Sequence, residues 1–132
     1  MTEGEVIQAM REHLEGLFPK VCPVCNRTYE TFRDYLLIAK PEGSAISYDA
    51  EVDDWNPANP IGTLTFANCP CGNTLALSSE GMPLLRLWSL LNWARTETKK
   101  RNQSPEELIN YLRDQITQQV LNDPVKGDRA RP

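Results

Sequence analysis

The chain has 132 residues, 14 of them basic and 18 acidic, which gives a formal net charge of −4. This length suits one domain, and the acidic balance disfavours general nucleic-acid binders and proteins that bind anionic membranes, because both classes carry a surplus of Lys and Arg. Residues 1–5 lack the basic and apolar segments of a secretory signal. The longest apolar stretch, 82–94, is shorter than the roughly 20 residues that span a membrane. We therefore expect a cytoplasmic protein without a membrane contact.

Residues 2–18 predict an amphipathic helix. Thr2, followed three residues later by Glu5, fits a capping box at its start. Apolar residues then recur on one face at helical spacing: Val6, Ile7, Met10, Leu14, Leu17 and Phe18. Pro19 ends the helix. The only histidine of the chain, His13, falls beside this apolar stripe, so we expect a partly exposed residue at the helix edge.

Two short motifs, Cys22-Pro23-Val24-Cys25 and Cys69-Pro70-Cys71-Gly72, contain all four cysteines of the chain. A gap of one or two residues lets one tight turn direct two sulfurs at the same point, and thiolates are good ligands for zinc. Four thiolates predict a closed, structural site, because a catalytic zinc usually keeps one position open. In a reducing cytosol paired cysteines are more often metal ligands than disulfides. A disulfide or redox role and a different metal remain alternatives.

The cysteine pattern resembles the zinc-ribbon class of four-cysteine domains over residues 22–72. The resemblance implies that Cys22, Cys25, Cys69 and Cys71 bind one Zn²⁺. The chain departs from that class in two ways: its second motif is C-x-C, and the interval between the motifs is far longer than the roughly 15–20 residues of the simple pattern. We therefore expect an extra subdomain between the two metal-binding turns.

Two interpretations fit residues 28–48. Apolar and aromatic residues recur at helical spacing, namely Tyr29, Phe32, Tyr35 and Leu36. Residues 35–39 also fit a buried strand that turns at 41–43 and returns over 45–48. We favour a short helical turn followed by that hairpin.

Residues 49–60 contain two prolines and two asparagines and predict an acidic loop. Asp49, Glu51 and Asp53 alternate as in a calcium-binding loop, but the required glycine and terminal glutamate are missing. A solvated loop is therefore the better interpretation. Trp55 within it either anchors the loop to the core or contacts a partner.

Residues 61–80 predict a β-hairpin with the second cysteine motif at its tip. Apolar residues lie among threonines before the motif, and residues 74–77 form the returning strand. A two-stranded hairpin alone is marginally stable in water. We therefore expect the metal and the neighbouring helices to stabilise it.

Residues 82–101 predict a long helix with Pro83 at an early position. Its apolar residues cover more than half of the helical circumference: Leu84, Leu85, Leu87, Trp88, Leu90, Leu91 and Ala94. Either the helix is central and covers the hairpin, with Leu87, Trp88 and Leu91 deeply buried, or its second side meets another chain. Trp93 is expected to point outward beside Arg86.

Residues 104–121 carry the clearest helix signals, with Ser104 as the cap, Pro105 in the first position and Glu107 in the third. A narrow apolar stripe suits packing against the preceding helix: Leu108, Ile109, Leu112, Ile116 and Val120. Residues 122–132 predict a disordered tail. The sequence thus predicts one zinc-stapled α+β domain over 1–121, in which a small antiparallel sheet with zinc-ribbon-like turns is packed by an N-terminal helix and a C-terminal helix pair.

No sequence motif indicates an enzyme, since the chain lacks a phosphate-binding loop and a dinucleotide fingerprint and has one histidine. We expect a non-enzymatic interaction or regulatory module with one structural Zn²⁺, acting through a protein partner or a homodimer. Trp55, Trp88 and Trp93 are the candidate contact residues. Two alternatives are a thiol redox sensor that uses the same cysteines and a nucleic-acid-binding zinc ribbon that uses residues 99–101, which the net charge disfavours.

Overall fold

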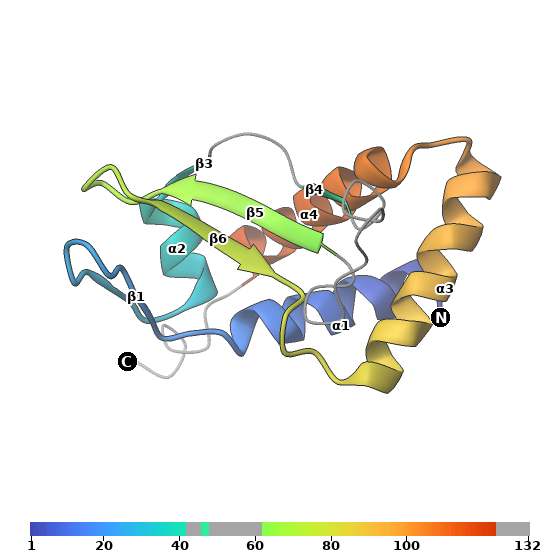
Figure 1. Cartoon of the computed structure of the whole chain (residues 1–132), viewed down its shortest axis with the longest axis horizontal. Coiled ribbons are helices and arrows are strands. Elements are labelled where there is room, and N and C mark those ends of the chain that lie inside the picture. The colour runs from blue at the N-terminus through green and yellow to red at the C-terminus, as the bar shows by residue number, and fades with distance from the viewer. Residues whose placement is uncertain (42–45, 48–61, 124–132) are drawn as a thin grey trace.

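A computed structural model of the chain describes residues 1–41, 46–47 and 62–123. In chain order its elements are α1 (Glu3–Glu15), β1 (Lys20–Val21), β2 (Thr28–Tyr29), α2 (Phe32–Ile38), β3 (Lys40–Pro41), β4 (Ile46–Ser47), β5 (Gly62–Asn68), β6 (Thr74–Ser78), α3 (Leu84–Arg101) and α4 (Pro105–Asn122) (Figure 1). Helices and two small antiparallel sheets confirm the α+β class. In the described ranges no helix has the length and apolarity that a membrane span needs.

Helix α1 begins at the predicted capping box. The Thr2 hydroxyl accepts a hydrogen bond from the Glu5 N–H at 3.2 Å, and the Glu5 carboxylate accepts one from the Thr2 N–H at 2.8 Å. The helix ends at Glu15, before the predicted end at residue 18. His13 Nε2 lies 3.0 Å from the Ser78 carbonyl oxygen, so this side chain joins α1 to the end of β6.

The larger sheet is arranged around β5. β6 pairs with β5 to form the predicted hairpin, with Asn68 opposite Thr74 beside the tip. β3 and β4 pair with the two ends of β5, where Lys40 lies opposite Asn68 and Ile46 opposite Thr63. β1 and β2 form a separate two-stranded hairpin. Each of the two hairpins therefore ends in one of the cysteine motifs.

The strand predicted over residues 35–39 is wrong, because these residues belong mainly to helix α2. Thr31 caps this helix, and its hydroxyl accepts a hydrogen bond from the Asp34 N–H at 3.1 Å. Phe32 and Tyr35 are both buried on one face, as helical spacing requires. The following strands β3 and β4 pair with β5 and not with each other. The acidic loop predicted over 49–60 lies outside the described residues.

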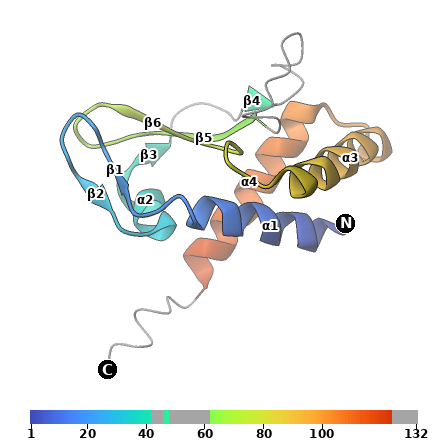
Figure 2. The same ribbon diagram turned by 60° about the horizontal axis from the view of Figure 1, so that its bottom comes forward.

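Helix α4 is the element that contacts most of the others, packing against α1, α2, α3, β4 and β5 (Figure 2). Its predicted apolar stripe is buried throughout: Leu108, Ile109, Leu112, Ile116 and Val120. At its C-terminus Arg33 donates hydrogen bonds to the carbonyls of Val120 and Leu121 at 3.0 and 2.9 Å, and Arg11 pairs with Asp123 at 2.6 Å. These cations complement the negative end of the helix dipole. Residues 124–132, most of the predicted tail, are not among the described residues.

Helix α3 lies at the edge of the molecule, and not at its centre (Figures 1 and 2). Leu87 and Leu91 are buried as predicted, and α3 packs against α4. The predicted burial of Trp88 is wrong, since this residue is 44% exposed, and Leu84 and Leu85 are 59% and 83% exposed. The physical reason is that α4, and not α3, packs against strand β5 of the hairpin. One side of the wide apolar surface of α3 is therefore buried in the core. On the other side, apolar side chains of its first two turns remain exposed to solvent.

The prediction that Trp93 points outward beside Arg86 is also wrong. Trp93 is partly buried against the core. The guanidinium carbon of Arg101 lies 5.7 Å from the centre of the Trp93 ring, and the same group pairs with Glu3 at 2.6 Å. Arg86 pairs instead with a carboxylate of α1. Trp93 therefore helps to join the start of α1 to the end of α3.

Ser104→Ala is expected to lower the free energy of unfolding by about 1 kcal/mol. The Ser104 hydroxyl accepts a hydrogen bond from the Glu107 N–H at 3.1 Å, and the Glu107 carboxylate accepts one from the Ser104 N–H at 3.0 Å. The urea midpoint measures the loss. Ser89→Ala is the matched control, because Ser89 is exposed within α3 and donates to the Leu85 carbonyl. We expect that change to be neutral or slightly stabilising, and equal losses in both variants would contradict a capping role for Ser104.

Candidate metal centre

The two cysteine motifs lie side by side at one end of the molecule (Figures 1 and 2). Cys22 and Cys25 lie in the turn between β1 and β2, and Cys69 and Cys71 lie in the turn between β5 and β6. All four Sγ atoms are within 4.8 Å of one another. The fold thus brings together the four residues that the sequence predicts as ligands.

The spacing of the sulfurs fits a tetrahedral ion. Four sulfurs at about 2.3 Å from one zinc ion would stand roughly 3.8 Å apart. The Sγ atoms of Cys22 and Cys71 are 3.7 Å apart, and those of Cys25 and Cys69 are 3.6 Å apart. These two distances are close to those that a bound zinc ion would require, and the other sulfur pairs lie within 4.8 Å.

The two turns have matching backbones. Asn26 and Gly72, the residues that directly follow the motifs, have positive φ angles of 62° and 96°. Their N–H groups donate to the carbonyls of Cys22 and Cys69 at 2.9 and 2.8 Å. Gly72 takes this left-handed conformation without steric cost, and Asn tolerates it better than most residues. Within each closed turn, the backbone N–H of the second cysteine is directed at the sulfur of the first.

The buried cysteine of each motif has a lowered pKa. The N–H of Cys25 is the main cause that lowers the pKa of Cys22 to about 6, and the N–H of Cys71 acts in the same way to lower the pKa of Cys69. The N–H of Asn73 acts to lower the pKa of Cys71, but burial and the neighbouring thiols raise it to about 11. A bound divalent cation would displace the remaining protons, so we expect metal affinity to fall as the pH is lowered, and to fall more steeply below about 6, where Cys22 is protonated too.

Two further side chains are placed to support anionic sulfur. Asn73 Nδ2 lies 3.6 Å from Cys22 Sγ, to which it can donate. Tyr29 is fully buried, and its hydroxyl lacks a hydrogen bond of good geometry among the described atoms. It faces Cys69, whose pKa it helps to lower, and burial followed by this contact raises the pKa of Tyr29. A buried donor without another acceptor suits a metal-bound thiolate at Cys69 better than a neutral thiol.

The sequence does not reveal these two supporting residues. A buried tyrosine fits an apolar core equally well, so Tyr29 has no signal that distinguishes it. Asn73 follows the second motif closely, and this position is the one feature of the sequence that indicates a role beside the sulfurs. Of the predicted contact residues, Trp88 and Trp93 belong to α3, which lies at the opposite end of the molecule from the two cysteine turns (Figure 1). Trp55 is not among the described residues.

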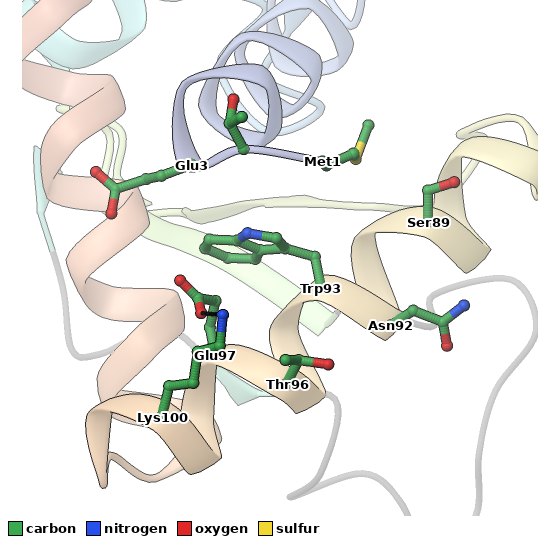
Figure 3. A pocket seen from close by; sticks show the side chains of 9 residues that line it. Met1, Glu3, Ser89, Asn92, Trp93, Thr96, Glu97 and Lys100 are labelled. Atoms are coloured by element: carbon green, nitrogen blue, oxygen red, sulfur yellow. Dashed lines mark ion pairs between the residues drawn. The ribbon is translucent and has the colours of Figure 1, made fainter.

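A pocket of about 560 Å³ lies beside Trp93, between the start of α1 and α3 (Figure 3). Its two carboxylates already have partners. Glu3 pairs with Arg101 at 2.6 Å, and Glu97 pairs with Arg101 at 3.3 Å and with Lys100 at 3.9 Å. The pair with Glu3 joins α1 to α3, and the two pairs of Glu97 lie within α3. The charges that could orient a ligand therefore already have partners, and we assign the pocket no binding role.

No protein-family model matches this chain, and no curated protein or solved structure matches it either. The four-cysteine cluster is the feature on which a functional assignment depends.

Proposed function

We propose that this protein is a non-enzymatic interaction or regulatory module stapled by one structural Zn²⁺, with Cys22, Cys25, Cys69 and Cys71 as the ligands. The observation that carries the proposal is the convergence of four thiols at tetrahedral spacing from two separate hairpins. A closed tetrahedral set of four thiolates is typical of structural zinc. Such a site leaves no position open for a substrate, and the ion would supply a cross-link between the hairpins.

Elemental analysis of the purified, reduced protein tests the proposal. We expect about one zinc per chain, and Cys25→Ser or Cys71→Ser should reduce the metal content. Val24→Ser is the matched control, because Val24 is exposed in the same turn and is not a ligand. Its metal content should equal that of the parent chain. A folded parent protein without metal and with four titratable thiols would overturn the proposal.

A second copy of the chain is the partner we propose for this module. The support comes from the first two turns of α3, where Leu84, Leu85 and Trp88 keep 59%, 83% and 44% of their surface exposed. An apolar helix face at the edge of a molecule can meet its own copy across a two-fold axis. Light scattering over a concentration series should show a dimer that Leu85→Lys weakens. Leu37→Lys, at an exposed leucine of α2, is the control, and a parent chain that stays monomeric would contradict the dimer.

The basic residues at the end of α3 weigh against the nucleic-acid alternative. Arg101 pairs with Glu3 and Glu97, and Lys100 lies 3.9 Å from Glu97. Most of the positive charge of residues 99–101 is therefore offset by nearby carboxylates. A salt-dependent binding assay with single-stranded and duplex oligonucleotides tests this alternative directly.

A further inference from the structure

We propose that a hydroperoxide converts the four-cysteine site into two disulfides, Cys22–Cys71 and Cys25–Cys69, which join the same two hairpins that the metal joins. This inference rests on the proposed function in one respect: it treats the same four sulfurs as the metal ligands. The two disulfides would hold the hairpins together in place of the metal ion, so oxidation would not release the hairpins from each other.

The pairing follows from two sulfur contacts. The Sγ atoms of Cys22 and Cys71 are 3.7 Å apart, those of Cys25 and Cys69 are 3.6 Å apart, and both contacts cross from one hairpin to the other. A bond within a motif would instead have to form inside a turn that is already closed, by the Asn26 N–H on the Cys22 carbonyl or by the Gly72 N–H on the Cys69 carbonyl. A disulfide within C-x-C would also have to distort that tight turn to reach its preferred dihedral geometry.

Each proposed pair combines one exposed and one buried cysteine. Cys25 and Cys71 are exposed, whereas Cys22 and Cys69 are buried. A peroxide in solvent therefore reaches the second cysteine of each motif first. The nearest buried sulfur of the opposite hairpin is then in place to resolve the oxidised group before it is oxidised further.

The chemistry balances with the peroxide as the oxidant. An exposed sulfur, which the bound ion would hold as a thiolate, attacks one peroxide oxygen, the O–O bond breaks, and the sulfur becomes a sulfenic acid as hydroxide leaves. The buried thiolate attacks that sulfur, the S–S bond forms, and the S–OH bond breaks with loss of hydroxide. Each pair loses two electrons to one hydrogen peroxide, and two protons convert the hydroxides to water. Two equivalents complete both pairs, and no thiolate then remains to hold the ion.

The oxidised chain should stay closed at this end of the fold. The two bonds would connect residues 49 and 44 positions apart in the sequence. Bonds that close long loops restrict the unfolded chain more than bonds within a short turn. We therefore expect the oxidised protein to melt at a higher temperature than the reduced, metal-free protein.

Peptide mapping of the intact chain after hydrogen peroxide tests the pairing. Trypsin releases residues 21–27 with both cysteines of the first motif, and a separate longer peptide carries both cysteines of the second. The proposal predicts that these two peptides stay joined without reductant and separate after reduction. Partial reduction and alkylation should then pair Cys22 with Cys71 and Cys25 with Cys69. Separate peptides with internal disulfides, or with sulfinic acids only, would overturn the proposal.

A pair of two-cysteine variants provides the matched comparison. The chain with Cys25→Ser and Cys69→Ser keeps Cys22 and Cys71 and should oxidise quickly. The chain with Cys69→Ser and Cys71→Ser keeps only the first motif and should oxidise more slowly. If circular dichroism shows that both variants are unfolded, the peptide map of the parent chain alone tests the pairing of the sulfurs. A parent protein purified without zinc would count against the proposed function, whereas a zinc-loaded protein that forms disulfides within each motif would count against this inference alone.

Discussion

Chelating the proposed zinc ion under reducing conditions is expected to open the two cysteine hairpins and to lower the melting temperature of the protein sharply. Strands β1 and β2 have two residues each, and an isolated hairpin is marginal in water even when it is longer. Apparent binding free energies of structural zinc reach roughly 10–16 kcal/mol in small zinc domains. Even a fraction of that energy is large beside a total stability of about 5–15 kcal/mol.

Hydrogen exchange followed by NMR locates this effect. After chelation the amides of residues 20–29 and 66–76 should lose protection first, and those of α4 should lose it last, because α4 is packed against most of the other elements. Cys25→Ser should reproduce the pattern without a chelator. Val24→Ser, an exposed change in the same turn, should leave it intact. Unchanged protection in both hairpins after the metal is removed would mean that the site is not structural.

Leu91→Ala is expected to lower the free energy of unfolding by about 2–5 kcal/mol. Leu91 is 1% exposed on the inner side of α3, which packs against α4. Removing its side chain would leave a cavity that rigid neighbours fill only partly. Urea denaturation with an unchanged m-value measures the loss.

Leu85→Ala is the matched control for this change. It makes the same substitution in the same helix, at a side chain that is 83% exposed. We expect a change within about 0.5 kcal/mol. A loss under about 1 kcal/mol for Leu91→Ala, or equal losses for the two variants, would contradict the packing of α3 described above.

The helices were predictable where their ends carry a local signal. Two helices begin at capping boxes that are recognisable from residue spacing alone, namely Thr2 with Glu5 and Ser104 with Glu107. The packing order of the helices has no such local signal. The wide apolar surface of α3 suggested a central helix, but α4, with its narrower stripe, holds that position because it contacts elements on several sides.

The four-cysteine cluster was predictable because its chemistry is local. Two cysteine motifs with Asn26 and Gly72 at the positions of positive φ specify two turns that present sulfur. The sequence could not specify how the turns approach each other, so the cross-hairpin contacts emerged only from the fold. The same holds for Tyr29, which reaches Cys69 because β2 places it beside the other hairpin.

X-ray absorption at the zinc edge of the purified, reduced protein is the most direct test of the four-cysteine zinc site. We expect a first shell of four sulfurs at about 2.3 Å from one zinc per chain. This shell should keep its sulfur count in Val24→Ser and lose sulfur in Cys71→Ser. A first shell dominated by nitrogen or oxygen, or a folded protein that carries no zinc, would contradict the proposed site.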